Sequence, residues 1–109
     1  SVGGDTRKEA WPWRLPLKQF SAQLDMLASH DWRTITIGEL VDSQRSAGPR
    51  EIAITFDDGY VDNLAACAEL VRRGMRASWF VVTNCLGRDP GWDDAGRPVQ
   101  RLLDATELR

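Results

Sequence analysis

The stretch that decides the fold is Ile52-Ala53-Ile54-Thr55-Phe56-Asp57-Asp58-Gly59-Tyr60, an apolar run that ends in two carboxylates and a glycine. Such a run of apolar and β-branched residues is typical of a strand buried on both faces, as in parallel sheets covered by helices. Gly59 supplies the backbone freedom for a turn after the strand, so both carboxylates can lean toward the mouth of the sheet. Because α/β proteins place their active sites there, the sequence predicts an acidic site at Asp57 and Asp58.

The two aspartates also have a purely structural interpretation. Asp before a helix is an ordinary N-cap, and Asp-Gly is an ordinary turn signal. Two adjacent carboxylates, however, cost desolvation and repulsion that a single capping residue avoids. A division of labour, in which one carboxylate holds a metal and the other moves a proton, would account for the pair. Spacing alone leaves both interpretations open.

Helical signals precede the acidic stretch. Pro16 suits the first turn of a helix, and apolar residues follow it at helical spacing: Leu17, Phe20, Leu24 and Leu27. A turn is expected next. Thr36 and Glu39 then form a capping-box pattern, which predicts a second, short helix through Leu40 and Val41. Residues 46–49 end that helix and lead into the central strand.

A helix and a second strand follow the acidic stretch. The helix opens at residues 61–63 and stops at Gly74. Its expected buried face consists of Leu64, Cys67, Ala68 and Val71. A strand is predicted at 77–82, and strand, helix and strand at this spacing imply a parallel pair with a right-handed crossover. The expected hydrophobic core is Phe20, Leu24, Ile52, Ile54, Leu64, Val71, Phe80 and Val81.

Composition excludes several classes of protein. The length of 109 residues allows at most one domain, and a hydrophobic share of 42% is compatible with a packed core. A net charge of -2 offers no electrostatic case for nucleic acid. No apolar stretch approaches the roughly 20 residues that span a bilayer. The two cysteines, Cys67 and Cys85, are too few for a disulfide framework.

Two further residues carry weaker signals. Trp92 lies in a loop-like segment, residues 84–98, after the second strand. Its ring would either stack on a sugar or anchor the loop against the rim of the sheet, and anchoring is the commoner role of loop tryptophans. His30 is the only histidine, and an imidazole at the end of the first helix can meet the last helix carbonyls. Ligation by His30 would need a partner at ligand spacing, and none is nearby.

The string Thr55-Phe56-Asp57-Asp58-Gly59 resembles the first motif of the polysaccharide deacetylases, the NodB-homology family or carbohydrate esterase family four. Segments on both sides are similar to that family as well, in the order Phe20–Leu27, Thr34–Leu40, Val61–Asn63 and Ala77–Val82. The similarity therefore covers roughly residues 20–82. A five-residue motif is moderately specific by itself, and it becomes strong in this order and context.

The resemblance implies a fold and an activity. The fold would be the N-terminal portion of a distorted (β/α) barrel with parallel strands, with residues 1–15 as an irregular lead-in and 16–109 as a partial deacetylase domain. The activity would be metal-dependent removal of N-acetyl or O-acetyl groups from a polysaccharide or oligosaccharide. By the same resemblance, Asp57 matches the general base and Asp58 the metal-binding aspartate. The metal is usually zinc, and a cell-envelope, periplasmic or extracellular location would fit.

The chain departs from the family pattern, because it lacks a histidine motif and the later segments that supply an arginine, a substrate-lining aspartate and tryptophan, and a histidine general acid. Zinc in the family is also held by two histidines of a His-Ser/Thr-x-x-His motif, which this sequence lacks. We therefore expect residues 104–109 to begin a helix that precedes the motif, and we expect this chain alone to be no competent deacetylase.

Two other function classes stay open. A non-catalytic, glycan-binding relative would tolerate the missing histidines. A magnesium-binding receiver-type domain would need a further acceptor aspartate at the end of a later strand, and residues 81–84 offer none. A phosphatase of the Asp-x-Asp-Gly type would need an aspartate at the position of Phe56.

Overall fold

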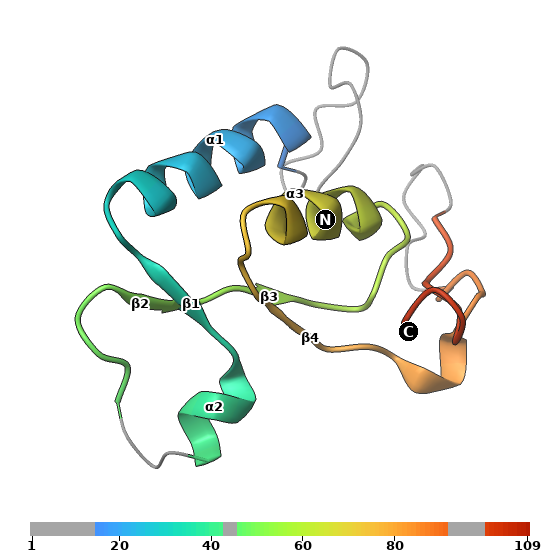
Figure 1. Cartoon of the computed structure of the whole chain (residues 1–109). Coiled ribbons are helices and arrows are strands. Elements are labelled where there is room, and N and C mark those ends of the chain that lie inside the picture. The colour runs from blue at the N-terminus through green and yellow to red at the C-terminus, as the bar shows by residue number, and fades with distance from the viewer. Residues whose placement is uncertain (1–14, 43–45, 92–99) are drawn as a thin grey trace.

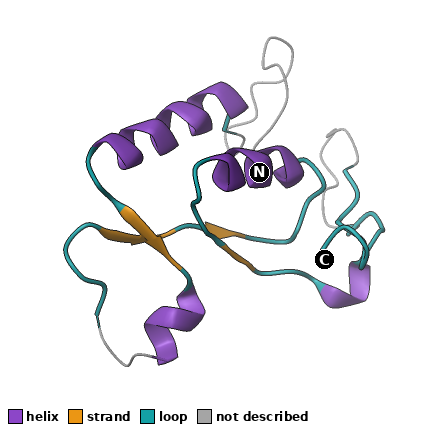
Figure 2. Cartoon of the chain, viewed as in Figure 1, coloured by secondary structure: helices purple, strands orange, loops and turns teal. Residues whose placement is uncertain are grey.

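The structure is a computed structural model that describes residues 15–42, 46–91 and 100–109 (Figure 1). Short parallel strands alternate with helices in it, as Figure 2 shows by colour. The elements are α1 (Leu17–Ser29), β1 (Arg33–Ile35), α2 (Ile37–Asp42), β2 (Glu51–Ala53), β3 (Thr55–Phe56), α3 (Asn63–Arg72), β4 (Ser78–Trp79) and the 3-10 helix η1 (Thr83–Cys85). This arrangement agrees with the expected α/β class, whereas barrel closure stays a prediction. Most of the predicted lead-in, residues 1–14, lies outside the described residues.

The strands pair in parallel, as predicted. β1 lies beside β2 with Thr34 opposite Ile52, and β3 lies beside β4 with Phe56 opposite Trp79. Only Ile54 separates β2 from β3, so residues 51–56 run as one extended segment that changes partners along its length. The second strand is shorter than the predicted 77–82, since β4 is Ser78–Trp79, and one further bond runs from Phe80 N–H to Phe56 O at 2.8 Å.

Both partners use the same edge of the segment 51–56. The carbonyl of Arg50 accepts from Arg33 N–H at 2.8 Å, and the carbonyl of Ile54 accepts from Ser78 N–H at 2.8 Å. Alternate residues of a strand direct their backbone groups to one edge, and positions 50 and 54 are of the same parity. β1 therefore pairs with the first part of this edge, and β4 pairs with the second part.

β1 itself was not predicted. The sequence indicated only a turn between the first two helices, but the structure places a three-residue strand there, with Thr34 and Ile35 buried. A strand of three residues is too short to reveal its period in the sequence. Its position is fixed instead by pairing with β2, which lies far along the chain.

The hydrophobic core joins α1, β3 and α3. Its buried members are Phe20, Leu24, Phe56, Ala66 and Leu70. The Phe20 and Phe56 rings meet edge to face with centroids 6.0 Å apart, and the Phe56 ring stacks on that of Trp79 at 4.5 Å. Aromatic pairs at these separations add to the free energy gained by burial. The predictions for Phe20 and Leu24 are confirmed.

For three other members of the predicted core the prediction is wrong, because they are exposed. Leu64 is 39% exposed, Val71 is 71% exposed and Phe80 is 53% exposed. Ile54 is half-buried and packs against the core, so its prediction is confirmed, whereas Ile52 and Val81 are half-buried and are not members of the core cluster. The expected inner face of α3 therefore has the wrong phase: instead of Leu64, Cys67, Ala68 and Val71, its buried residues are Asn63, Ala66 and Leu70. The three observed residues also recur at helical spacing, so periodicity alone does not select the face.

A polar network links α1 to α3 at the side of this core. The Arg73 guanidinium donates to Glu69 Oε2 at 2.7 Å, to Asp25 Oδ1 at 2.8 Å and to Ser21 Oγ at 2.7 Å. The Ser21 hydroxyl in turn donates to Glu69 Oε2 at 2.8 Å. These bonds, first of all the one from Arg73, lower the pKa of Glu69 to about 2.

Local signals place the helix ends as the sequence predicted. Thr36 N–H donates to Glu39 Oε2 at 2.8 Å and Glu39 N–H donates to Thr36 Oγ1 at 3.1 Å, which is the predicted capping box. α3 ends in a Schellman motif, in which Gly74 has φ +64° and Met75 N–H donates to Leu70 O at 2.9 Å.

The end of α1 uses the same motif with an unusual residue. Trp32 N–H donates to Leu27 O at 3.0 Å and Asp31 N–H donates to Ala28 O at 3.2 Å. Asp31 has φ +59°, where glycine is the common choice. His30 Nδ1 lies 2.8 Å from Met26 O, so the predicted contact between the imidazole and a helix carbonyl is confirmed. No helix among the described residues is long and apolar enough to cross a membrane.

Candidate functional site

The two candidate residues follow β3 directly, at the carboxyl end of the parallel strands. Asp57 is exposed and Asp58 is half-buried. Gly59 N–H donates to Asp57 O at 2.8 Å, and Asp58 between them has φ +66°. This is a three-residue γ-turn with a positive φ at its centre, a rare and strained conformation. Strain of this kind is found most often at functional sites.

Gly59, the residue after Asp58, packs against Val81 and so supports the turn. Gly59 is buried and has φ +78°. A Cβ added to Gly59 would lie 3.0 Å from Val81 Cγ1, a contact so tight that the valine side chain would have to shift. The turn therefore rests directly on the segment that leaves β4, and a residue with a Cβ at position 59 would be strained by both its φ and this contact.

A second segment braces the turn from the C-terminal part of the chain. Leu103 N–H donates to Gly59 O at 2.8 Å, and Val61 N–H donates to Arg101 O at 3.2 Å. Between these bonds, Tyr60 and Leu102 form an antiparallel bridge. We call residues 101–103 the bracing segment. Figure 1 shows the C-terminal residues beside η1, close to this end of the strands.

The bracing segment is itself enclosed. Leu102 N–H donates to Arg88 O at 2.9 Å, and Leu103 O accepts from Gly87 N–H at 3.1 Å. Leu102 is 0% exposed and Leu103 is 2% exposed. No role was predicted for this segment; its two adjacent leucines between polar residues indicate burial but not the contact with Gly59.

An ion pair closes the bracing segment. Arg101 Nη1 and Nη2 each donate to Glu107 at 2.7 Å, one to each carboxylate oxygen. Glu107 Oε2 also accepts from Asp104 N–H at 3.0 Å, and Asp104 Oδ1 accepts from Glu107 N–H at 3.0 Å. The guanidinium of Arg101 is the main cause that lowers the pKa of Glu107 to about 2. Residues 105–108 form one capped turn, in line with the expected start of a helix.

The donor set for a metal is incomplete among the described residues. Asp57 and Asp58 offer carboxylate oxygens, but no group of three His, Cys, Asp or Glu side chains in the described ranges is arranged to hold an ion. A catalytic zinc site needs three protein ligands. His30 is exposed and bonds within α1, so it supplies none of them there. Trp92 lies outside the described residues, and its two proposed roles stay predictions.

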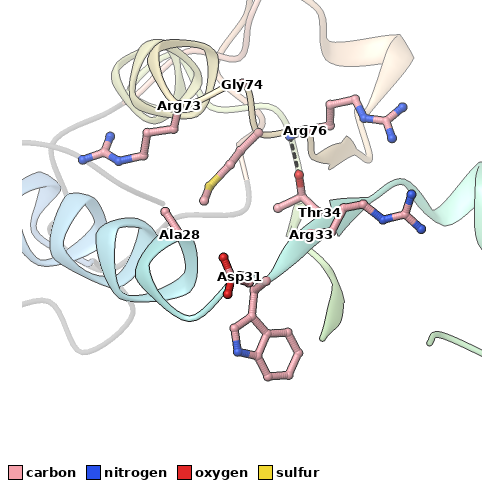
Figure 3. Close-up of a pocket in the computed structure, with 9 residues that line it drawn as sticks. Ala28, Asp31, Arg33, Thr34, Arg73, Gly74 and Arg76 are labelled. Carbon is pink, nitrogen blue, oxygen red and sulfur yellow. Dashed lines mark hydrogen bonds between the residues drawn. The ribbon is translucent and has the colours of Figure 1, made fainter. Parts of the chain in front are cut away.

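A depression of about 540 Å³ lies at the other end of the strands, between the ends of α1 and α3 (Figure 3). Its lining consists of Ala28, Asp31, Trp32, Arg33, Thr34, Arg73, Gly74, Met75 and Arg76. Its arginines are engaged elsewhere: Arg33 pairs with Glu51, Arg73 with Glu69, and Arg76 with Glu39 at 2.8 Å. The depression therefore presents paired charges and is not continuous with the acidic turn.

Comparison with known proteins gives one curated relative of note. The chain is 30% identical over 78 residues to a Bacillus subtilis (strain 168) protein named "Putative polysaccharide deacetylase YxkH". The aligned region is 68% of this chain and 28% of that protein, so the chain spans just over a quarter of the relative's length. No family model matches the chain. No solved structure matches it.

Proposed function

We propose that this chain contributes Asp57 and Asp58 to a metal-dependent deacetylase that acts on an acetylated polysaccharide. The observation that carries the proposal is the strained turn of these two residues at the carboxyl end of a parallel strand. The name of the Bacillus subtilis relative and the resemblance of residues 55–59 to the family motif support it. On this proposal the short parallel strands belong to a (β/α) barrel.

The two carboxylates would have different roles. Asp57 is exposed, which suits a general base that takes the proton of an attacking water. Asp58 is half-buried at the centre of the γ-turn, which suits an oxygen ligand held in one orientation. A divalent cation, zinc on this proposal, would polarise the acetyl carbonyl and acidify a water. Since the sequence has a single histidine, we propose that two histidine ligands come from residues outside it.

The roles are separable by two isosteric substitutions in the protein that carries this sequence. Asp57→Asn should keep the metal content and lower turnover by about 10²–10⁴-fold. Asp58→Asn should lower both metal content and turnover, because it removes a ligand. Turnover is measured as acetate release from acetylated chito-oligosaccharides, and metal content by elemental analysis.

Asp89→Asn is the matched control. Asp89 is an exposed loop aspartate whose Oδ1 accepts from Gly91 N–H at 3.0 Å. The same change there should leave turnover and metal content unaltered. Full deacetylase activity in the Asp57→Asn protein, after deamidation has been excluded, would contradict the assignment of the base.

The incomplete donor set among the described residues favours one second candidate, a non-catalytic glycan-binding relative. Such a protein would bind acetylated oligosaccharides without releasing acetate at any zinc concentration. In that case Asp57→Asn and Asp89→Asn would leave glycan affinity equally unaffected.

A further inference from the structure

We infer that Glu107 is a positioning residue for the acidic turn and acts on it through Arg101 and the bracing segment. The effect on catalysis rests on the proposed function, whereas the effect on the turn does not.

The first step is that Glu107 holds both ends of the bracing segment. Its carboxylate takes the two bonds of 2.7 Å from Arg101, and one of its oxygens also accepts from Asp104 N–H at 3.0 Å. Arg101 precedes Leu102-Leu103 and Asp104 follows them. One side chain therefore fixes the distance across the two leucines, and a two-pronged bond to an arginine fixes orientation as well.

The second step is that the bracing segment holds the turn. Leu103 N–H bonds Gly59 O at 2.8 Å, and Arg101 O accepts from Val61 N–H at 3.2 Å. The Gly59 carbonyl lies one residue beyond Asp58, and Gly59 N–H makes the bond that closes the γ-turn. A displacement of the bracing segment is thus passed to the turn through its own hydrogen bonds.

The third step is that different interactions keep the bracing segment on the protein and fix its register. Burial of Leu102 and Leu103 keeps the bracing segment on the protein, but the hydrophobic effect is non-directional and does not fix register. Register comes from hydrogen bonds: the backbone bonds to residues 59, 61, 87 and 88, and the bonds of Glu107 to Arg101 and Asp104, which hold the segment in line for the others. Loss of the Glu107 charge should therefore leave the segment bound and let the turn fluctuate.

The experiment compares Glu107→Gln with Glu69→Gln in the full protein. Glu69 is a matched control, because it is also an arginine-paired carboxylate with a pKa of about 2, in the network between α1 and α3. The first readout is amide hydrogen exchange at Gly59, Val61 and Leu103. The second is kcat and KM for acetylated chito-oligosaccharides.

Glu107→Gln should raise exchange at these three amides about tenfold and lower kcat by about 10–100-fold, with KM changed less than about twofold. Glu69→Gln should leave the three amides and kcat unchanged. Unchanged exchange in Glu107→Gln, or equal acceleration by Glu69→Gln, would overturn the inference. So would an unaltered kcat despite faster exchange in an active protein.

Failure of the proposed function has a different signature. If the unsubstituted protein releases no acetate, the deacetylase assignment fails, and the exchange readout alone decides the positioning role. If Glu107→Gln does not fold, Arg101→Lys replaces it under the same criteria, since lysine keeps the charge and loses the two-pronged bond.

Discussion

Replacement of Gly59 by alanine probes how tightly the acidic turn is packed. Two costs are expected. A φ of +78° costs a residue with a Cβ about 1–2 kcal/mol. The new methyl would lie 3.0 Å from Val81 Cγ1, and overpacking of this kind costs about 1–2 kcal/mol. The free energy of unfolding should therefore fall by about 2–4 kcal/mol, and Asp58 should move with the turn.

Substitutions at two other glycines distinguish the cost of the backbone conformation from the cost of the steric contact. Gly74 has φ +64° with no atom within 4 Å of the position of a Cβ, so Gly74→Ala should show the backbone cost alone, about 1–2 kcal/mol. Gly38 lies in α2, with Thr36 Oγ1 as the nearest atom at 3.8 Å. Gly38→Ala should stabilise by about 0.5–1 kcal/mol, because alanine is the better helix former.

The assay is urea unfolding of the purified protein, with a changed midpoint at an unchanged slope as the criterion. Val81→Ala in the Gly59→Ala background removes the contacting methyl and should recover about 1 kcal/mol relative to the sum of the single changes. The reasoning is refuted if Gly59→Ala is no more destabilising than Gly74→Ala, or if the pair shows no coupling.

Three further outcomes are expected. Asp31→Gly should raise the free energy of unfolding by about 1 kcal/mol, because glycine relieves the φ of +59° at the end of α1; an unchanged urea midpoint would count against the strain. Glu69 and Glu107 have pKa values lowered to about 2, so their stabilisation should be complete above about pH 4.5 and lost as the pH falls toward 2. With both replaced by glutamine, the urea midpoint should depend less on pH over that range. A decline as steep as that of the unsubstituted protein would contradict the pairing of these carboxylates with arginines. Leu70→Ala should cost about 2–4 kcal/mol and Val71→Ala less than about 0.5 kcal/mol, since they are 2% and 71% exposed; a larger loss for Val71→Ala would show that α3 has the phase predicted from the sequence.

Features set by neighbours in the sequence were predictable. The capping box of Thr36 and Glu39 depends on residues three apart, and the stop at Gly74 depends on one residue without a Cβ. The acidic turn was also accessible, because an apolar run followed by Asp-Asp-Gly is a local signal.

Features set by contacts between distant residues were not predictable. The inner face of α3 depends on what lies beneath it, and Ala66 and Leu70 contact a core built from α1 and β3. The bracing segment is separated from Gly59 by more than forty positions, and no pattern within residues 101–103 specifies that contact. These misses have one physical cause, which is that tertiary packing chooses among faces that local periodicity leaves equivalent.

The shared edge of the segment 51–56 makes the lengths of β1 and β4 interdependent. Where their paths meet, side-chain hydroxyls replace backbone pairing: Thr34 Oγ1 accepts from Arg76 N–H at 2.8 Å, and Ser78 Oγ accepts from Ile37 N–H at 2.9 Å. At its far end, β4 stops opposite Phe56, just before the γ-turn. The available edge is thus finite, and an insertion that lengthened β1 would displace β4 and, with it, the Val81 support of the acidic turn. The length of β1 is therefore constrained by the geometry of the acidic turn, although the turn follows β3.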